Sequence, residues 1–252
     1  MMADKLDINT KAQSLRKELG EDLESAIDIF SLAHTIPQLT LIYYPMGERI
    51  SGMCIKNQGY PIIGINSAMS LGRQRFSLAH ELYHLYFDES DHTLVCSKKI
   101  GSGNEVEKTA DQFASYLLIP PVALESFIRR YKKDSGGDLG NKEIVRLEQH
   151  FGVSRQALLY RLVSDHKLTM AEAEKFREGV ICSAVNLGYD DALYRPLPES
   201  KQYKTYGYYI EKAEELYEKE LVSTGKYEQL LLTAFRPDLV YGEEFEGGEL
   251  ND

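Results

Sequence analysis

The sequence lacks any apolar run long enough to cross a membrane, and it contains few cysteines. Its hydrophobic stretches fall short of the about 18 residues that a membrane-spanning helix needs. Its first twenty residues are polar, unlike those of a signal peptide. Cys54, Cys96 and Cys182 are odd in number and far apart, which does not suit a disulfide framework. We therefore expect a cytoplasmic protein with reduced thiols.

Positive charge is also scarce, because 29 Lys and Arg residues stand against 39 Asp and Glu residues, giving a net charge of −10. This balance works against nonspecific binding to nucleic acid and suits a protein substrate. The sequence shows no internal repeat. Its 252 residues, of which 43% are hydrophobic, can bury a sizeable core in one large or two modest domains.

The most informative segment is residues 80–84, which read HELYH. In a helix, positions i and i+4 share one face about 6 Å apart, so the imidazoles of His80 and His84 can hold one tetrahedral ion. Glu81 can then reach the remaining position of the ion and accept a proton from a water bound there. Residues 73–87 continue one helical pattern without proline or internal glycine around the motif, which argues against a chance match. The segment predicts a catalytic Zn²⁺ site for peptide hydrolysis.

A second predicted helix offers the third protein ligand. Residues 104–119 read NEVEKTADQFASYLLI and carry an apolar stripe at helical spacing, and two prolines end the helix. Glu107 borders the stripe near the helix start, and Asp111 lies four residues later on the same side. We expect Glu107 to bind the ion, and Asp111 to accept the free ring N–H of a ligand histidine and fix its tautomer.

Other assignments of these residues are open. His92 and Cys96 follow the motif closely and could bind zinc as well, although a surface histidine and a small apolar filler are their ordinary roles. Glu105 is the alternative acid in the same turn as Glu107. Glu107 itself could be a solvated acid favoured by the helix dipole, and Asp111 could form a surface ion pair.

Residues 73–84 (RQRFSLAHELYH) and 107–120 (EKTADQFASYLLIP) together resemble the ImmA/IrrE family of bacterial and phage metallopeptidases. The family pattern is R-Q-R-F-T-[LI]-A-H-E-[LI]-G-H, followed by E-x-x-A-[ND]-x-F-A-x-x-L-L-M-P. The resemblance implies that His80 and His84 are zinc ligands, that Glu81 is the general base and that Glu107 is the third ligand.

The resemblance covers roughly residues 12–168. Two residues depart from the pattern, since Tyr83 stands in place of the usual glycine and Ile119 in place of the usual methionine. Neither is a ligand, but a bulky Tyr83 can reshape the cleft. The resemblance also implies a substrate, namely a helix-turn-helix repressor whose cleavage derepresses phage, mobile-element or stress genes.

The period of the hydrophobic pattern predicts an α+β fold with a mostly helical, zincin-like core. A helix is expected over residues 10–34, followed by a small antiparallel sheet of three strands at 41–44, 50–55 and 60–65 with a turn at 57–59. Pro61 indicates that the third strand is an edge or begins at the proline. We expect a catalytic core over residues 1–131, a helical region over 142–187 and a helical extension with an acidic tail over 188–252.

Residues 142–167 have the pattern of a helix-turn-helix, with Ser154 as the N-cap of the second helix. Arg155, Gln156, Tyr160 and Arg161 would lie near a recognition surface, so a DNA-binding regulator with a structural zinc is an alternative function. A non-catalytic toxin–antitoxin component is another. We favour packing of these helices on the catalytic core, because this segment has few bases.

Two helices at 206–221 and 226–235 are expected to pack through aromatic residues.

Overall fold

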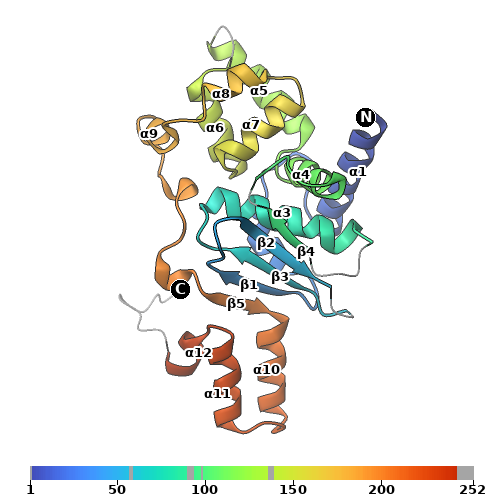
Figure 1. Cartoon of the computed structure of the whole chain (residues 1–252), viewed down its shortest axis with the longest axis vertical. Helices are drawn as coiled ribbons and strands as arrows, with labels where there is room; N and C mark the ends of the chain where they lie inside the picture. The colour runs from blue at the N-terminus through green and yellow to red at the C-terminus, as the bar shows by residue number, and fades with distance from the viewer. Residues whose placement is uncertain (1, 57–58, 90–93, 98, 136–138, 243–252) are drawn as a thin grey trace.

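The computed structural model describes residues 2–56, 59–89, 94–97, 99–135 and 139–242. Within these residues a five-stranded sheet forms the centre of an elongated molecule (Figure 1). Helix α3 crosses one face of the sheet, and helices α1 and α4 pack beyond it. Helices α5 to α8 gather at one end of the molecule, and α10 to α12 lie at the other end beside β5. The expected α+β class is confirmed.

The strand order is β4-β2-β3-β1-β5, with β1 and β3 parallel and the other pairs antiparallel. The predicted three-stranded antiparallel meander is therefore wrong. The hairpin of β2 and β3 leaves one edge of β3 free, and β1 pairs there in the same direction. Strand β3 is buried along most of its length, which suits a central position. The strands are β1 (Thr40–Tyr44), β2 (Ile50–Ile55), β3 (Ile62–Asn66), β4 (Leu94–Ser97) and β5 (Lys204–Gly207).

The two helices expected to carry the metal ligands are present close to their predicted bounds. Helix α3 spans Leu71–Phe87 and is buried over most of its length between the sheet and α4. Helix α4 spans Glu105–Leu118, and the side chain of Asn104 caps it by accepting the N–H of Glu107 at 2.9 Å. The apolar stripe of α4 is buried from Ala110 onward. The two helices thus meet through apolar faces, and their polar positions lie along the shared border.

The predicted helix over residues 10–34 is wrong, since the chain forms α1 (Met2–Glu18) and α2 (Ile29–His34) with a turn between them. Gly20 takes a positive φ of 82° in this turn. The carboxylate of Asp22 accepts the N–H groups of Glu24 and Ser25, which replaces helical hydrogen bonds. The buried guanidinium of Arg16 then donates to the carbonyl of Asp22 and fixes the turn.

The predicted helix-turn-helix segment does contain two helices and a turn. Gly152 ends α6 in the left-handed conformation, and Ser154 caps α7 by accepting the N–H of Ala157. A longer α5 runs to Ser135, beyond its expected end at Tyr131, so the loop expected from residue 132 begins later. The helices of this region are α5 (Pro121–Ser135), α6 (Asn141–Phe151), α7 (Arg155–Ser164), α8 (Met170–Glu174) and α9 (Val180–Val185).

The C-terminal region adds a strand that the sequence did not reveal. Residues 204–207, partly assigned to a helix at 206–221, form β5 against β1. Three helices follow, α10 (Tyr208–Glu218), α11 (Thr224–Thr233) and α12 (Pro237–Tyr241).

The expected turn at residues 57–59, His92 and the acidic tail from residue 243 lie wholly or partly outside the described residues. None of the described helices has the length and apolar character needed to cross a membrane. The three-region division stays a prediction.

Candidate metal centre

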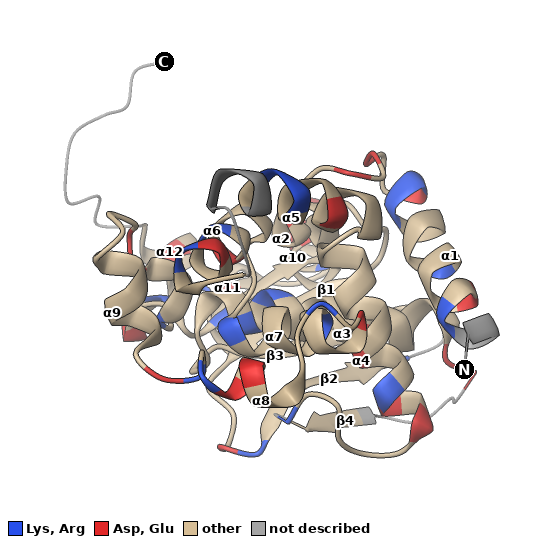
Figure 2. Ribbon diagram, turned by 90° about the horizontal axis from the view of Figure 1, so that it is seen from above, with Lys and Arg blue, Asp and Glu red and all other residues tan. Residues whose placement is uncertain are grey.

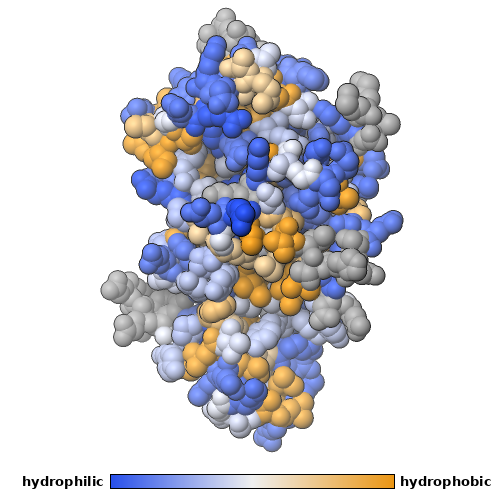
Figure 3. Space-filling view, in the orientation of Figure 1, coloured by the Kyte–Doolittle hydropathy of each residue, from blue (hydrophilic) through white to orange (hydrophobic). Residues whose placement is uncertain are grey.

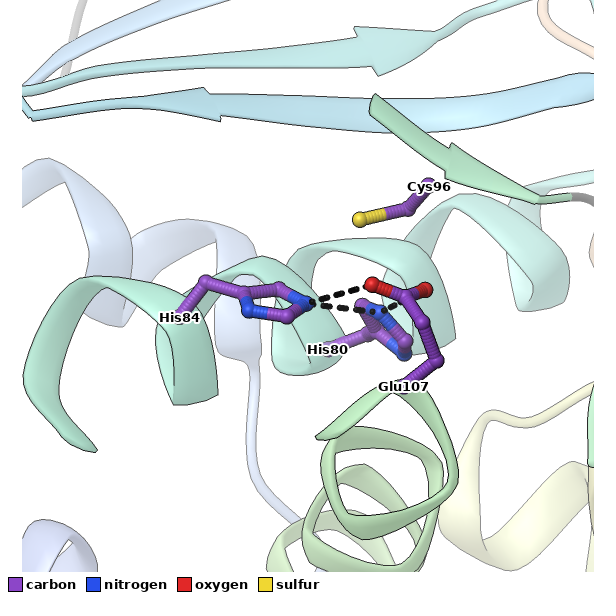
Figure 4. A group of neighbouring side chains, drawn as sticks. All are labelled: His80, His84, Cys96 and Glu107. Atoms are coloured by element: carbon purple, nitrogen blue, oxygen red, sulfur yellow. Dashed lines mark hydrogen bonds and ion pairs between the residues drawn. The ribbon is translucent and has the colours of Figure 1, made fainter. Parts of the chain in front are cut away.

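Helix α3 places the two histidines of the motif on one face, with both rings pointing toward α4 (Figure 4). The Nε2 atoms of His80 and His84 lie 3.1 Å apart. Their side chains are 6% and 0% exposed, respectively, so the pair is almost sealed from solvent. Their i, i+4 spacing produces this approach directly, as the sequence predicts.

The carboxylate of Glu107 completes the group from the first turn of α4. Its Oε2 lies 3.4 Å from His80 Nε2, and its Oε1 lies 3.4 Å from His84 Nε2. Glu107 therefore faces both imidazoles at once. By contrast, the alternative acid Glu105 is 88% exposed and pairs with Lys108, so it lies outside the cluster.

Carboxylates hold the other nitrogen of each ring. His80 Nδ1 lies 2.9 Å from Asp111 Oδ1, and His84 Nδ1 lies 2.9 Å from Asp88 Oδ2. An ionised carboxylate only accepts hydrogen bonds, so each Nδ1 carries its proton. Both Nε2 atoms then present lone pairs toward one another and toward Glu107. The two lone pairs and the carboxylate repel one another unless a proton or a cation lies between them. A divalent cation fits this set of donor atoms.

Asp111 occupies the position expected of a residue that orients a ligand histidine. Its second oxygen accepts the backbone N–H of Gly101 at 2.6 Å, which fixes the carboxylate against the loop after β4. Asp88 orients His84 in the same way, a role that the sequence did not predict. The spacing could have predicted this contact, because Asp88 lies four residues after His84, directly after the last residue of α3.

The pKa values reflect the concentration of negative charge. Burial acts to lower the pKa of His80, but its hydrogen bonds to Asp111 and Glu107 raise that pKa to about 10. Burial acts to raise the pKa of Glu107, whereas its contacts with His80 and His84 lower it to about 2. Both shifts mean that the site stabilises added positive charge, which is the property of a cation site.

Glu81 lies next to the cluster, beneath the sheet. Its side chain has no exposed surface, and burial raises the pKa of the carboxyl to about 7. The thiol of Cys96 donates to Glu81 Oε2 at 3.4 Å, while Oε1 is buried without a hydrogen-bond partner among the described residues. A Cβ atom on Gly52 of β2 would lie 2.7 Å from Oε1, so only glycine leaves room for the carboxylate there. A carboxyl poised near neutral pH can both accept and deliver a proton.

Comparison with known proteins agrees with this geometry. The sequence model of the family described as the IrrE N-terminal-like domain, a peptidase family, matches residues 39–163. Residues 39–163 are thus similar to the ImmA/IrrE family. The radiation response metalloprotease IrrE of Deinococcus deserti is 29% identical to it over 139 residues, which are 54% of this chain and 46% of that protein. The chain thus spans about half the length of this curated relative.

The part that matches the ImmA/IrrE family runs from just before β1 to the end of α7 and so contains the whole candidate site. The departure at Tyr83 places its ring edge-on against His84, with centroids 5.8 Å apart. Its ring is mostly buried and packs against Phe87 and Phe113, with centroids 6.0 Å and 5.5 Å away. The departure at Ile119 is buried in the core. Residues from β5 onward lie outside the match.

Proposed function

We propose that the protein is a zinc-dependent peptidase whose metal is held by His80, His84 and Glu107. The observation that carries this proposal is the convergence of two imidazole lone pairs and a carboxylate beside a buried glutamate. Three protein ligands of this type leave room for a further position, as in catalytic zinc sites. We propose that it acts in the cytoplasm, where its thiols stay reduced.

When bound, zinc would lower the pKa of a coordinated water to about 7 and polarise the scissile carbonyl. Glu81 would take up the proton of the attacking water at a carboxylate oxygen and later deliver it to the leaving amine. Asp111 and Asp88 would hold the ring tautomers that leave both Nε2 atoms free to bind the metal. The cover of the sheet over Glu81 keeps bulk water away from the carboxylate.

Strand β4 is the sheet edge suited to receive an extended substrate. It pairs with β2 on one side, and its other edge is free of described strands. Figure 3 shows apolar surface over this part of the sheet, where Val95 of β4 is 54% exposed. An extended peptide could pair with β4 and pass close to the cluster, because Cys96 of this strand is a member of that cluster.

We propose a helix-turn-helix repressor as the substrate, and derepression of phage, mobile-element or stress genes as the outcome of cleavage. The match of residues 39–163 to the family model supports this proposal, as does the name of the similar radiation response metalloprotease. The net charge of −10 suits a basic, DNA-binding substrate protein.

The alternative of a DNA-binding regulator has less support. Arg155 forms a buried ion pair with Glu148, and Arg161 donates to the carbonyls of Ser115 and Ile119 inside the fold. Two of the side chains expected on a recognition surface are thus committed to packing and cannot contact phosphate. In the view of Figure 2, acidic and basic residues of the described chain intermingle and form no continuous basic face. We propose that nucleic acid is not a partner.

The ligand set can be tested by measuring zinc in the purified protein. We expect about one zinc per chain in the wild type and a strong loss in Glu107→Ala, because one of three protein ligands is removed. Glu105→Ala is the matched control, since it removes an exposed acid from the same helical turn. Retention of zinc by Glu107→Ala together with its loss in His92→Ala would overturn the assignment.

The substrate can be tested by co-expression with candidate helix-turn-helix repressors from the same genome. We expect one repressor to be cut by the wild type and to remain intact with Glu81→Gln, which keeps the metal ligands but removes the base. Intact repressors with both proteins would refute this substrate.

A further inference from the structure

Cys96 belongs to the cluster of ligand atoms, although the proposed function assigns it no part. Its Sγ and the ligand atoms of His80, His84 and Glu107 all lie within 4.8 Å of one another. Figure 4 shows the sulfur reaching from β4 toward the space between His84 and Glu107. Cys96 is only 1% exposed, and its thiol hydrogen reaches Glu81. An apolar residue of similar size would leave this polar pocket without that donor.

The neighbourhood of Cys96 points to a ligand and not to a packing role alone. Glu81 Oε1 is buried and unpartnered among the described residues, and the two Nε2 atoms face each other at 3.1 Å. These groups favour positive charge between them, either a proton or a cation, and the thiol of Cys96 lies beside them. A cation bound here would favour the thiolate, because zinc binds thiolate strongly, and the thiol proton would pass along the existing hydrogen bond to Glu81 Oε2.

We propose that Cys96 supplies its thiolate as a fourth protein ligand, so that the resting site is closed by two histidines, one glutamate and one cysteine. The inference rests on the proposed metal site and deepens it by assigning a regulation. A four-ligand zinc site is closed, whereas hydrolysis needs an open position. The peptidase is therefore latent until the sulfur moves away.

The distances allow this closure with a small movement. Bonds of about 2.0 to 2.3 Å in a tetrahedral site place ligand atoms roughly 3.3 to 3.8 Å apart. No two of these ligand atoms lie more than 4.8 Å apart, so closure around an ion needs movements of at most about 1 Å. Within the four proposed ligands, one carboxylate and one thiolate would supply two negative charges. These would match the charge of a divalent cation that is also bound by two neutral imidazoles.

The strand that carries Cys96 links this latency to the substrate. Cys96 pairs with Gly52 in β2, and the register of β2 against β4 shifts between Ile50 and Gly52. The sheet is therefore irregular where the sulfur is attached. An extended peptide that pairs with the free edge of β4 acts on this same strand. Pairing of the substrate with β4 would then also move the sulfur of Cys96 away from the metal.

The test is X-ray absorption at the zinc edge of the intact, zinc-loaded protein without substrate. We expect one sulfur at about 2.3 Å in addition to nitrogen and oxygen ligands. Loading with cobalt instead of zinc should give a near-ultraviolet thiolate-to-cobalt band. That band should vanish in Cys96→Ser and persist in Cys54→Ser, the matched control that removes a buried thiol from the adjacent strand. Zinc affinity should fall roughly tenfold or more in Cys96→Ser alone.

The outcomes separate this inference from the peptidase proposal. A bound zinc with only nitrogen and oxygen ligands in the wild type would overturn the closure and leave the three-ligand peptidase site intact. It would assign Cys96 to holding Glu81 through its thiol hydrogen bond. Failure to bind zinc or cobalt at all would overturn both. Absorption of the unmutated protein decides the matter even if Cys96→Ser does not fold.

Discussion

Glu81 is a carboxylate enclosed between helix α3 and strand β2, and this enclosure makes it responsive to pH. Burial raises its pKa from 4.5 to about 7. The native state therefore holds the proton more tightly than the unfolded chain does. The protonated carboxyl therefore contributes to stability below pH 4.5, and this contribution is lost as pH rises through about 7. The free energy of unfolding should differ by about 3 kcal/mol between the two limits.

We expect metal-free wild-type protein to lose free energy of unfolding between pH 5 and pH 8 relative to Glu81→Gln, which has no proton to lose. Urea unfolding of both proteins at the two pH values measures this difference. An identical pH dependence in the two proteins would contradict the burial of an ionisable carboxyl at this position.

Gly52 gives a second prediction at the residue scale. A Cβ at this position would meet Glu81 Oε1 at 2.7 Å, and the flexible carboxylate would move aside. We expect Gly52→Ala to bind zinc normally but to lose activity on the order of 10- to 100-fold, because the base is misplaced. Gly64→Ala is the control on the adjacent strand, since its Cβ would meet the flexible side chains of Met53 and Met46. Equal activity of the two variants would show that Glu81 does not depend on the room that Gly52 leaves beside its carboxylate.

Several site residues could be predicted from sequence because helical spacing alone brings them together. The approach of His80 and His84, and the placement of Glu107 and Asp111 on one side of a second helix, follow from i and i+4 positions. The roles of Gly52 and of the thiol of Cys96 could not be predicted in this way. They depend on which strand covers the helix, and that contact joins segments far apart in the chain.

At the scale of elements, the start of α4 positions Glu107, the proposed third ligand. Asn104 caps the helix at the N–H of Glu107 itself. We expect Asn104→Ala to lower the free energy of unfolding by about 1 kcal/mol and to weaken zinc binding, because the first turn that holds Glu107 frays. Calorimetry and zinc titration measure the two effects. Ser223→Ala removes the corresponding cap of α11 and should lower stability without changing zinc affinity. Equal zinc affinity of Asn104→Ala and wild type would contradict this coupling.

The elements differ in how far sequence could define them. Helices α3 and α4 have uninterrupted apolar periodicity, and their predicted bounds hold within a few residues. The predicted helix over residues 10–34 fails because the side chains of Asp22 and Arg16 bind the backbone in the turn. Strands β4 and β5 have four residues each, too few for a periodic signal, and partners distant in the chain stabilise them.

At the scale of the whole molecule, the candidate site and the C-terminal helices lie at opposite edges of the sheet. Strand β4 carries Cys96 beside the candidate site, while β5 at the opposite edge leads into α10, α11 and α12 (Figure 1). We therefore expect changes at β5 to alter stability but not metal binding.

Gly207 at the end of β5 tests this separation. Its φ is +80°, and a Cβ there would lie 2.3 Å from the carbonyl oxygen of Leu39. We expect Gly207→Ala to cost roughly 1–3 kcal/mol or more of stability and to retain its zinc. Thermal unfolding and zinc content measure both effects. Gly225→Ala, with open space around the added methyl group, should be nearly neutral. Loss of zinc in Gly207→Ala would show that the two edges are coupled.

Hydrolysis of a peptide bond at this site is tested most directly by mixing purified, zinc-loaded protein with a helix-turn-helix repressor, the proposed substrate. Mass spectrometry of the repressor identifies any new terminus. We expect cleavage at a defined bond by the wild type, and none by Glu81→Gln carrying the same amount of zinc. Equal cleavage by both proteins would contradict the role of Glu81 and the mechanism built on it.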